Sequence, residues 1–226
     1  MGQGISAILT FAIGVAISPV PIIAVILMLF SDRAKVNGPA FLVGWVLSLA
    51  VVSTVIYALA HDGNVATSST AADSVSWGKI ALGVGLLALA RRNWRKRPAP
   101  GAQAEMPKWL STVESVSPVK AFGLAVVLAA VNPKNLILTA GAAAGLAQVS
   151  GITTTDAIVA IAVFVVIASL TIVGPVLYAL FGGEKARTSL NSAKAWLTTH
   201  NAAVMAVLFL VFGVDLIAKG LPPLTS

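Results

Sequence analysis

The stretch VNPKN, Val131–Asn135, places a proline and a lysine in the middle of an apolar segment. Residues 121–131 before it and residues 136–147 after it carry no charge. As one straight helix, residues 121–147 would be about 40 Å long, whereas the hydrocarbon core of a bilayer is about 30 Å thick. Proline also removes a backbone hydrogen bond and crowds a carbonyl of the preceding turn. The stretch therefore predicts a broken helix.

The composition predicts an all-α membrane protein. The chain of 226 residues is 58% hydrophobic and only 10% charged, with a mean hydropathy of +0.93. So little charge does not cover the surface of a soluble domain of this size. Six apolar segments have the length of a spanning helix, about 17–25 residues or more. They are residues 6–30, 38–60, 75–91, 119–147, 154–181 and 201–219.

The basic residues predict how these spans are oriented. Twelve of the fifteen lysines and arginines fall in alternate connecting segments, residues 32–37, 91–120 and 182–200. The segments between them, 61–76 and 148–156, contain none. Since lysine and arginine are enriched in cytoplasmic loops, we expect the basic segments in the cytoplasm and both termini outside. This topology accounts for the net charge of +7 without a nucleic-acid partner.

The densest group of positive charges directly follows the third predicted span. Such clusters beside a membrane bind anionic headgroups. The expected headgroup residues are Arg91, Arg92, Arg95, Lys96 and Arg97.

The break at residues 132–135 has a counterpart early in the chain. SPVP, residues 18–21, also follows eleven uncharged and largely apolar residues. Further pairs follow in the same order: TVIYALA (54–60) with GPVLYALFG (174–182), and VGLL (84–87) with FGVD (212–215). One half would have three spans, an odd number, so its copy must insert upside down. The pattern predicts six transmembrane helices as a 3+3 inverted repeat with discontinuous helices 1 and 4.

The predicted domains follow from this repeat. Residues 1–92 form the first three-helix repeat and residues 119–226 form the second. Residues 93–118 form a basic cytoplasmic linker, within which residues 106–116 could make a short interfacial helix.

We expect the two breaks, residues 18–21 and 132–135, to lie close together near the bilayer midplane. They predict a binding site there, because broken helices expose backbone groups that a ligand can use. Lys134 and Asp215 would lie at a similar depth, about 21 Å from the cytoplasmic side, and could be coupled. We expect Lys134 to act in transport rather than in folding. Alternatively, the polar residues satisfy a proline kink and Lys134 snorkels outward. The candidate site residues are Ser18, Pro19, Pro21, Asn132, Pro133, Lys134, Asn135 and Asp215.

Several kinds of chemistry have no motif here. The chain has no cysteine, and its two histidines fall at the ends of predicted spans. It lacks an ATP-binding motif, HExxH and a Ser–His arrangement. We therefore expect no enzymatic activity, metal or cofactor, and uphill transport would use a gradient or a partner.

Five segments resemble the GAP family of lipid-addressing proteins, for peptidoglycolipid or sulfolipid, in the LysE transporter superfamily. They are ISPVPIIAVILML (17–29), GPAFLVGW (38–45), AAVNPKNLIL (129–138), KAWLTTHNA (194–202) and FGVDLIAKGL (212–221). The resemblance implies a six-helix protein of the bacterial inner membrane that helps to move glycolipids or related lipids toward the outer envelope. It also implies a larger lipid transporter as a partner.

Two other functions stay open at this point. LysE-like exporters of amino acids have a similar NPK element, and a site with Lys134 and Asp215 could hold a zwitterion. The protein could instead be an accessory subunit that transports nothing alone. The expected partners are membrane lipids, with a larger lipid transporter or a second copy of the chain as a homodimer, and no nucleic acid.

Overall fold

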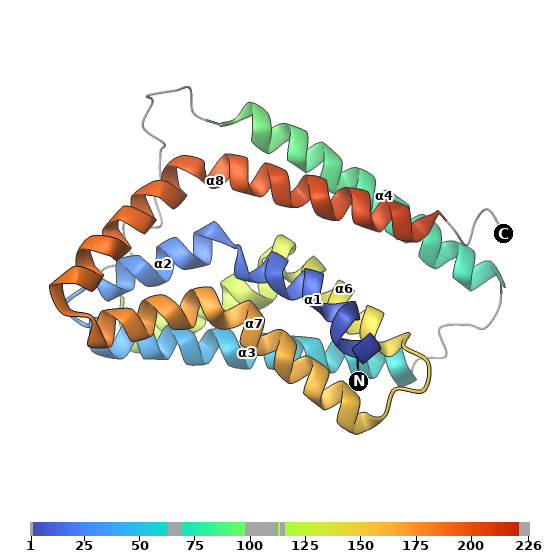
Figure 1. Ribbon diagram of the computed structural model, residues 1–226, viewed down its shortest axis with the longest axis horizontal. Coiled ribbons are helices and arrows are strands. Elements are labelled where there is room, and N and C mark those ends of the chain that lie inside the picture. The colour runs from blue at the N-terminus through green and yellow to red at the C-terminus, as the bar shows by residue number, and fades with distance from the viewer. Residues whose placement is uncertain (1, 63–68, 98–112, 114–115, 222–226) are drawn as a thin grey trace. The chain divides into compact units, whose positions relative to one another are not determined.

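The computed structural model describes residues 2–62, 69–97, 113 and 116–221. This part of the chain contains helices and short connections but no strand, which confirms the all-helical fold class (Figure 1). The helices are α1 (Gly2–Ala16), α2 (Pro19–Leu29), α3 (Ala34–Asp62), α4 (Ser69–Arg95), α5 (Pro118–Val126), the π-helical turn η2 (Val127–Val131), α6 (Pro133–Ala147), α7 (Thr154–Phe181) and α8 (Gly183–Gly220).

The chain divides into two compact units. The first contains residues 1–63 and 106–196, and the second contains residues 64–105 and 197–226. Each unit therefore combines segments from both predicted repeats, while the repeats themselves stay a prediction.

In the first unit, α3 packs against α5, α6 and α7, while α1 packs against α6 and α7. The inward face of α3 carries Phe41, Trp45 and Leu49, which are spaced four residues apart and are almost completely buried. The rings of Phe41 and Trp45 stack with their centroids 6.3 Å apart. Large side chains at helical spacing thus anchor α3 in the core of this unit.

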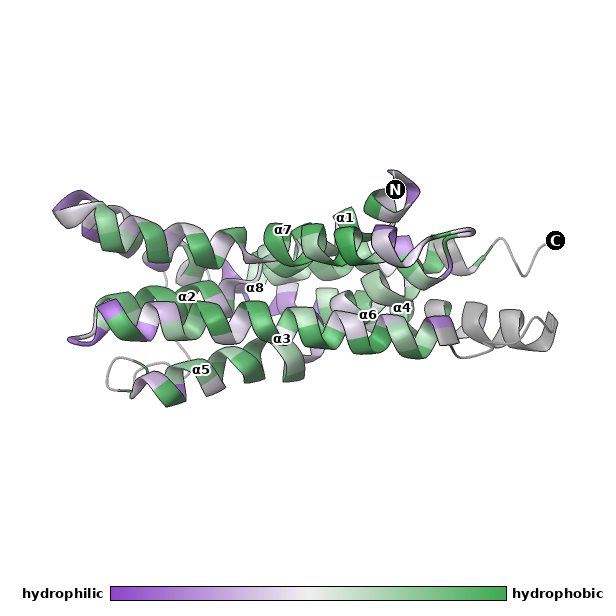
Figure 2. Ribbon diagram, turned by 90° about the horizontal axis from the view of Figure 1, so that it is seen from below, coloured by the Kyte–Doolittle hydropathy of each residue, from purple (hydrophilic) through white to green (hydrophobic). Residues whose placement is uncertain are grey.

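The opposite face of α3 is apolar and exposed. Its exposed side chains also recur every four residues along most of the helix, at Val43, Leu47, Val51, Val55 and Leu59. Figure 2 shows apolar residues along much of the length of α3, on the side of the helix that faces the viewer. A helix that is apolar on both its packed and its exposed faces is suited to lipid rather than water.

In the part of the chain that the structure describes, three helices are long and apolar enough to cross a membrane: α3, α7 and α8. Two bent pairs, α1 with α2 and the α5–η2 segment with α6, raise the candidates among the described residues to five. The chain is thus a multi-pass helical membrane protein. The predicted third span, residues 75–91, lies within α4, which is not among these candidates. The six-span count therefore stays a prediction.

The basic segment 182–200 is helical, although the sequence suggested a connecting loop. The helix α7 ends at Phe181, and α8 begins at Gly183, which adopts φ +57°. Glycine adopts this left-handed conformation without the steric penalty of a side chain. Because Gly182 and Gly183 reverse the chain within two residues, the remaining charged residues can continue as helix. The predicted interfacial helix, by contrast, lies largely outside the described residues.

Candidate functional site

The first break separates α1 from α2, which meet at a bend of 52°. Ser18 has an extended backbone at the break, with φ −107° and ψ 100°. Pro19 and Pro21 are the first and third residues of α2. The first turn of a helix leaves its amide N–H groups without helical partners, and proline has no N–H to leave. Two prolines here thus reduce the number of unsatisfied donors that the break creates inside an apolar region.

The second break lies between the π-helical turn η2 and α6, where the helix axis bends by 60°. Asn132 interrupts the helix, and its side-chain oxygen accepts a hydrogen bond from the backbone N–H of Lys134 at 3.1 Å. Pro133 again occupies the first position of the following helix. The two predicted breaks are therefore both confirmed. They share one design, in which a polar residue precedes a proline that begins the second helix.

The two breaks contact each other directly. The hydroxyl of Ser18 donates to the side-chain oxygen of Asn135 at 3.2 Å. The side-chain nitrogen of Asn135 donates to the carbonyl of Leu128, in η2, at 2.8 Å. Asn135 is fully buried, and it connects both broken segments. The prediction that the breaks lie close together is thus confirmed.

Lys134 connects the breaks a second time. Its ammonium nitrogen donates to the carbonyl of Gly14 at 2.8 Å and to that of Ile17 at 3.2 Å. In a continuous helix, the carbonyl of Ile17 would accept from residue 21, but Pro21 has no N–H. The lysine supplies the missing donor. A helix C-terminus also carries partial negative charge, so the end of α1 stabilises a cation at this position.

This geometry explains the lysine in the VNPKN stretch. Lys134 is only 6% exposed, so its side chain lies within the first unit rather than extending to the surface. Burying an ammonium is expensive unless hydrogen bonds replace its hydration. The end of α1 provides two acceptors, and in return Lys134 satisfies two carbonyls that the break had freed. The lysine therefore has a structural role in addition to any role in transport.

Asp215, the other predicted ionisable residue at depth, lies on α8 in the second unit and is half-buried. Lys134 belongs to the first unit, so their predicted coupling stays a prediction.

The sequence did not identify three further polar residues of this region. Thr171 on α7 donates to the carbonyl of Ala16 at 2.6 Å, so that a third carbonyl at the end of α1 is satisfied. Thr139 on α6 and Ser169 on α7 are buried, and their hydroxyl oxygens have no hydrogen-bond partner within the described part of the chain. Thr139 follows Asn135 by one helical turn and so lies on the same face of α6. The spacing of four residues from Asn135 is the one feature of the sequence that could have indicated Thr139 in advance.

The predicted headgroup residues lie at the C-terminal end of α4, in the second unit. Arg91, Arg92, Arg95 and Lys96 line an open cleft of about 370 Å³ together with Ala88. The guanidinium of Arg97 lies 4.1 Å from the centre of the Trp94 ring. The cluster is thus brought together, as expected for neighbours on a helix, while its binding to lipid stays a prediction.

These features define a multi-pass helical membrane protein in which two broken helices meet at a buried polar junction. A family model described as Sap, sulfolipid-1-addressing protein, matches residues 8–222, almost the whole chain. The protein belongs to this family. This agrees with its resemblance to lipid-addressing proteins. Neither the curated proteins nor the solved structures include a significant match.

Proposed function

We propose that the protein is a transporter or translocation factor that moves a lipid or glycolipid toward the outer envelope. The family description indicates a sulfolipid as the cargo class. The site would lie at the junction of the two breaks, and the chain would cross the membrane six times as a 3+3 inverted repeat.

The observation that carries this proposal is the way in which the breaks are joined. The two broken segments are held together by hydrogen bonds that the side chains of Ser18, Asn135 and Lys134 make. Side-chain hydrogen bonds can be exchanged for bonds to a ligand, whereas an intact helix offers no free groups. Broken helices that meet inside the membrane are typical of transporter sites. An anionic headgroup would compete with the carbonyls of Gly14 and Ile17 for the ammonium of Lys134.

The second unit supports an inverted repeat. The alignment that supports it is shifted by two positions from the pairing of residues 84–87 with 212–215 that the sequence suggested. With Gly83 aligned with Gly213, residues 81–88, ALGVGLLA, and residues 211–218, VFGVDLIA, share four residue types at the same positions. A Cβ atom on Gly83 would lie 2.7 Å from the carbonyl oxygen of Gly213, and one on Gly213 would lie 2.9 Å from that of Gly83. Equivalent residues meet each other at a two-fold axis. This reciprocal contact is therefore what a two-fold repeat requires.

The composition of the two units agrees with this symmetry. The first unit takes α1–α3 from the first repeat and α5–α7 from the second, including both breaks. The second unit takes α4 from the first repeat and the end of α8 from the second. Each unit thus contains corresponding parts of both repeats, as expected if the repeats are interlocked.

Location and partners are part of the proposal. The charge distribution supports a position in the bacterial cytoplasmic membrane with both termini outside. The resemblance to the LysE superfamily supports transport without an enzymatic reaction, beside a larger lipid transporter or as a homodimer.

Amino-acid export is the second candidate, because the ammonium of Lys134 could bind a substrate carboxylate in the same way as a headgroup. Reconstitution of the purified chain in vesicles separates the two. Transbilayer movement would be followed for a sulfated glycolipid with a reducible fluorophore, using a membrane-impermeant reductant, and efflux would be followed for a radiolabelled amino acid. We expect faster lipid movement than in protein-free vesicles, without amino-acid efflux. Efflux alone would support the exporter, and movement of neither would support an accessory subunit.

A further inference from the structure

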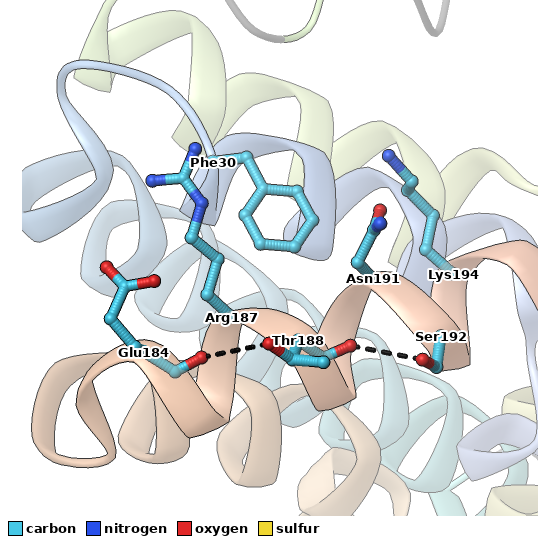
Figure 3. Close-up of a pocket in the computed structure, with 7 residues that line it drawn as sticks. All are labelled: Phe30, Glu184, Arg187, Thr188, Asn191, Ser192 and Lys194. Atoms are coloured by element: carbon cyan, nitrogen blue, oxygen red, sulfur yellow. Dashed lines mark hydrogen bonds between the residues drawn. The ribbon is translucent and has the colours of Figure 1, made fainter.

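A second polar cleft lies in the first unit, away from the helix breaks. It has a volume of about 580 Å³ and is lined by Phe30, which follows α2, and by the first turns of α8. The α8 residues that line it are Glu184, Arg187, Thr188, Asn191, Ser192 and Lys194. Figure 3 shows these side chains along one side of the helix, with the Phe30 ring facing them.

Two cations lie near the same aromatic ring. The guanidinium carbon of Arg187 lies 5.8 Å from the centre of the Phe30 ring, and the ammonium nitrogen of Lys194 lies 5.2 Å from it. Both distances are within the range of a cation–π interaction. Residues 187, 191 and 194 recur at helical spacing, so that Asn191 lies between the two cations, as Figure 3 shows. The ring thus holds both positive groups toward the cleft.

The other side chains define what the cleft would bind. The hydroxyl of Thr188 donates to the carbonyl of Glu184 at 3.3 Å, and that of Ser192 donates to the carbonyl of Thr188 at 3.1 Å. These two hydroxyls are thus used within the helix, whereas Arg187, Asn191 and Lys194 line the cleft with further groups that can donate hydrogen bonds. Glu184 is at one end of the row, beside Arg187 (Figure 3). An anion would therefore bind toward the Asn191 and Lys194 side of the guanidinium.

Exposed aromatic residues flank the cleft along the chain. Phe181, immediately before the turn into α8, is 83% exposed, and Trp196, two residues after Lys194, is 55% exposed. Aromatic residues of this kind are enriched where a membrane meets water. These aromatic residues therefore favour a position of the cleft at the depth of the lipid headgroups, on the cytoplasmic side that is predicted for the basic segments.

We propose that this cleft binds the phosphate or sulfate ester of an anionic lipid in the cytoplasmic leaflet. A planar guanidinium can bind two oxygens of such a group, while an ammonium and an amide bind the others. Basic pockets on the cytoplasmic side of helical membrane proteins bind lipid headgroups in this manner. The choice of a lipid as the ligand rests on the proposed function. The cleft would be the site at which a lipid of the cargo class is first bound.

The test measures binding rather than transport. The full chain, purified in a neutral detergent, would be titrated with short-chain phosphatidylglycerol, short-chain phosphatidylcholine or inorganic phosphate, with adducts counted by native mass spectrometry. The variant Arg187→Gln/Lys194→Gln removes both cations of the cleft. The matched control, Arg33→Gln/Lys35→Gln, removes two exposed charges at the nearby start of α3, one just before the helix and one in its first turn.

We expect the cleft variant to lose affinity for phosphatidylglycerol about tenfold for each cation removed, since 1.4 kcal/mol changes affinity tenfold. The control should lose little, and phosphatidylcholine should bind weakly throughout. Arg187→Lys keeps the charge but not the planar fork, so it should lose part of the affinity and serves if the double variant does not fold. Equal losses in the control and cleft variants, or no loss in a folded cleft variant, would overturn the inference. Displacement of the lipid by an equal concentration of inorganic phosphate would assign the cleft to a free anion. None of these outcomes depends on whether the chain moves lipid.

Discussion

Ser18 and Asn135 are 117 positions apart in the chain, yet the hydroxyl of one donates to the side-chain oxygen of the other at 3.2 Å. Each belongs to a helix break, and both side chains are buried. A bond at this place fixes the relative position of two broken helices that the backbone alone would leave free to separate. Its strength therefore bears on how readily the junction opens.

The variant Ser18→Ala removes the donor of this bond. We expect the free energy of unfolding to fall by about 1 kcal/mol, because hydrogen bonds between membrane helices contribute about 0.6–2 kcal/mol. Ser169→Ala is the matched control, since the Ser169 hydroxyl is buried without a partner among the described residues. Removing that hydroxyl should leave stability unchanged or raise it. Unfolding in detergent measures both, and equal destabilisation by the two variants would argue against the Ser18–Asn135 bond.

The contact between Gly83 and Gly213 makes a second prediction. Gly83→Ala would place a methyl group 2.7 Å from the Gly213 carbonyl oxygen, which forces the helices apart. Gly85→Ala, two residues further along α4, meets nothing within 4 Å. We expect the first change to lower the thermal midpoint and the second to leave it unchanged or raise it, since alanine favours helix over glycine by about 0.5–1 kcal/mol. Tolerance of Gly83→Ala equal to that of Gly85→Ala would remove the structural support for the repeat.

Orientation is tested by single cysteines in this cysteine-free chain. Thr155→Cys, at the start of α7, and Ser189→Cys, in the first turns of α8, are both at exposed positions. Because the segment 148–156 has no basic residue while 182–200 has three, only the cysteine at 155 should react with an impermeant thiol reagent in intact cells. Membrane permeabilisation should then expose the cysteine at 189. The reverse pattern would invert the topology.

Much of the junction could be predicted from the sequence because proline acts locally. Pro19 and Pro133 interrupt apolar segments too long for one straight span, and both breaks occur where these prolines are. Their proximity was expected from the predicted repeat, which relates the two segments by position. The local effect of proline and the predicted repeat were together sufficient to predict this part of the fold.

The partners of Lys134 could not be predicted in this way. Its acceptors are the backbone carbonyls of Gly14 and Ile17, and a backbone carbonyl has no signature in the sequence. An acidic side chain such as Asp215 was the only kind of partner that the sequence could suggest. The helical start of α8 was missed for a related reason: a high density of charge indicates a position outside the membrane, but it does not distinguish a helix from a loop.

The predicted role of Lys134 now combines structure and transport. Lys134→Met leaves the carbonyls of Gly14 and Ile17 without their donor, so we expect a loss of stability of about 1–3 kcal/mol. Lys120→Met is the matched control, because Lys120 is exposed in the first turn of α5. Unfolding measurements on both variants separate the loss of the bonds from the loss of a positive charge. Equal stability of the two variants would show that the lysine contributes nothing to the junction.

The most direct test is the rate at which these variants move a sulfated glycolipid across the bilayer of reconstituted vesicles. It would be compared for the original chain, Lys134→Met and Lys120→Met at equal amounts of folded protein. If an anionic headgroup passes the junction of the breaks, Lys134→Met should reduce the rate by about tenfold or more, since a hydrogen bond to a charged group contributes about 1.5–3 kcal/mol. Lys120→Met should retain the original rate. An unchanged rate in folded Lys134→Met protein would contradict a lipid site at this junction and leave the lysine with its structural role alone.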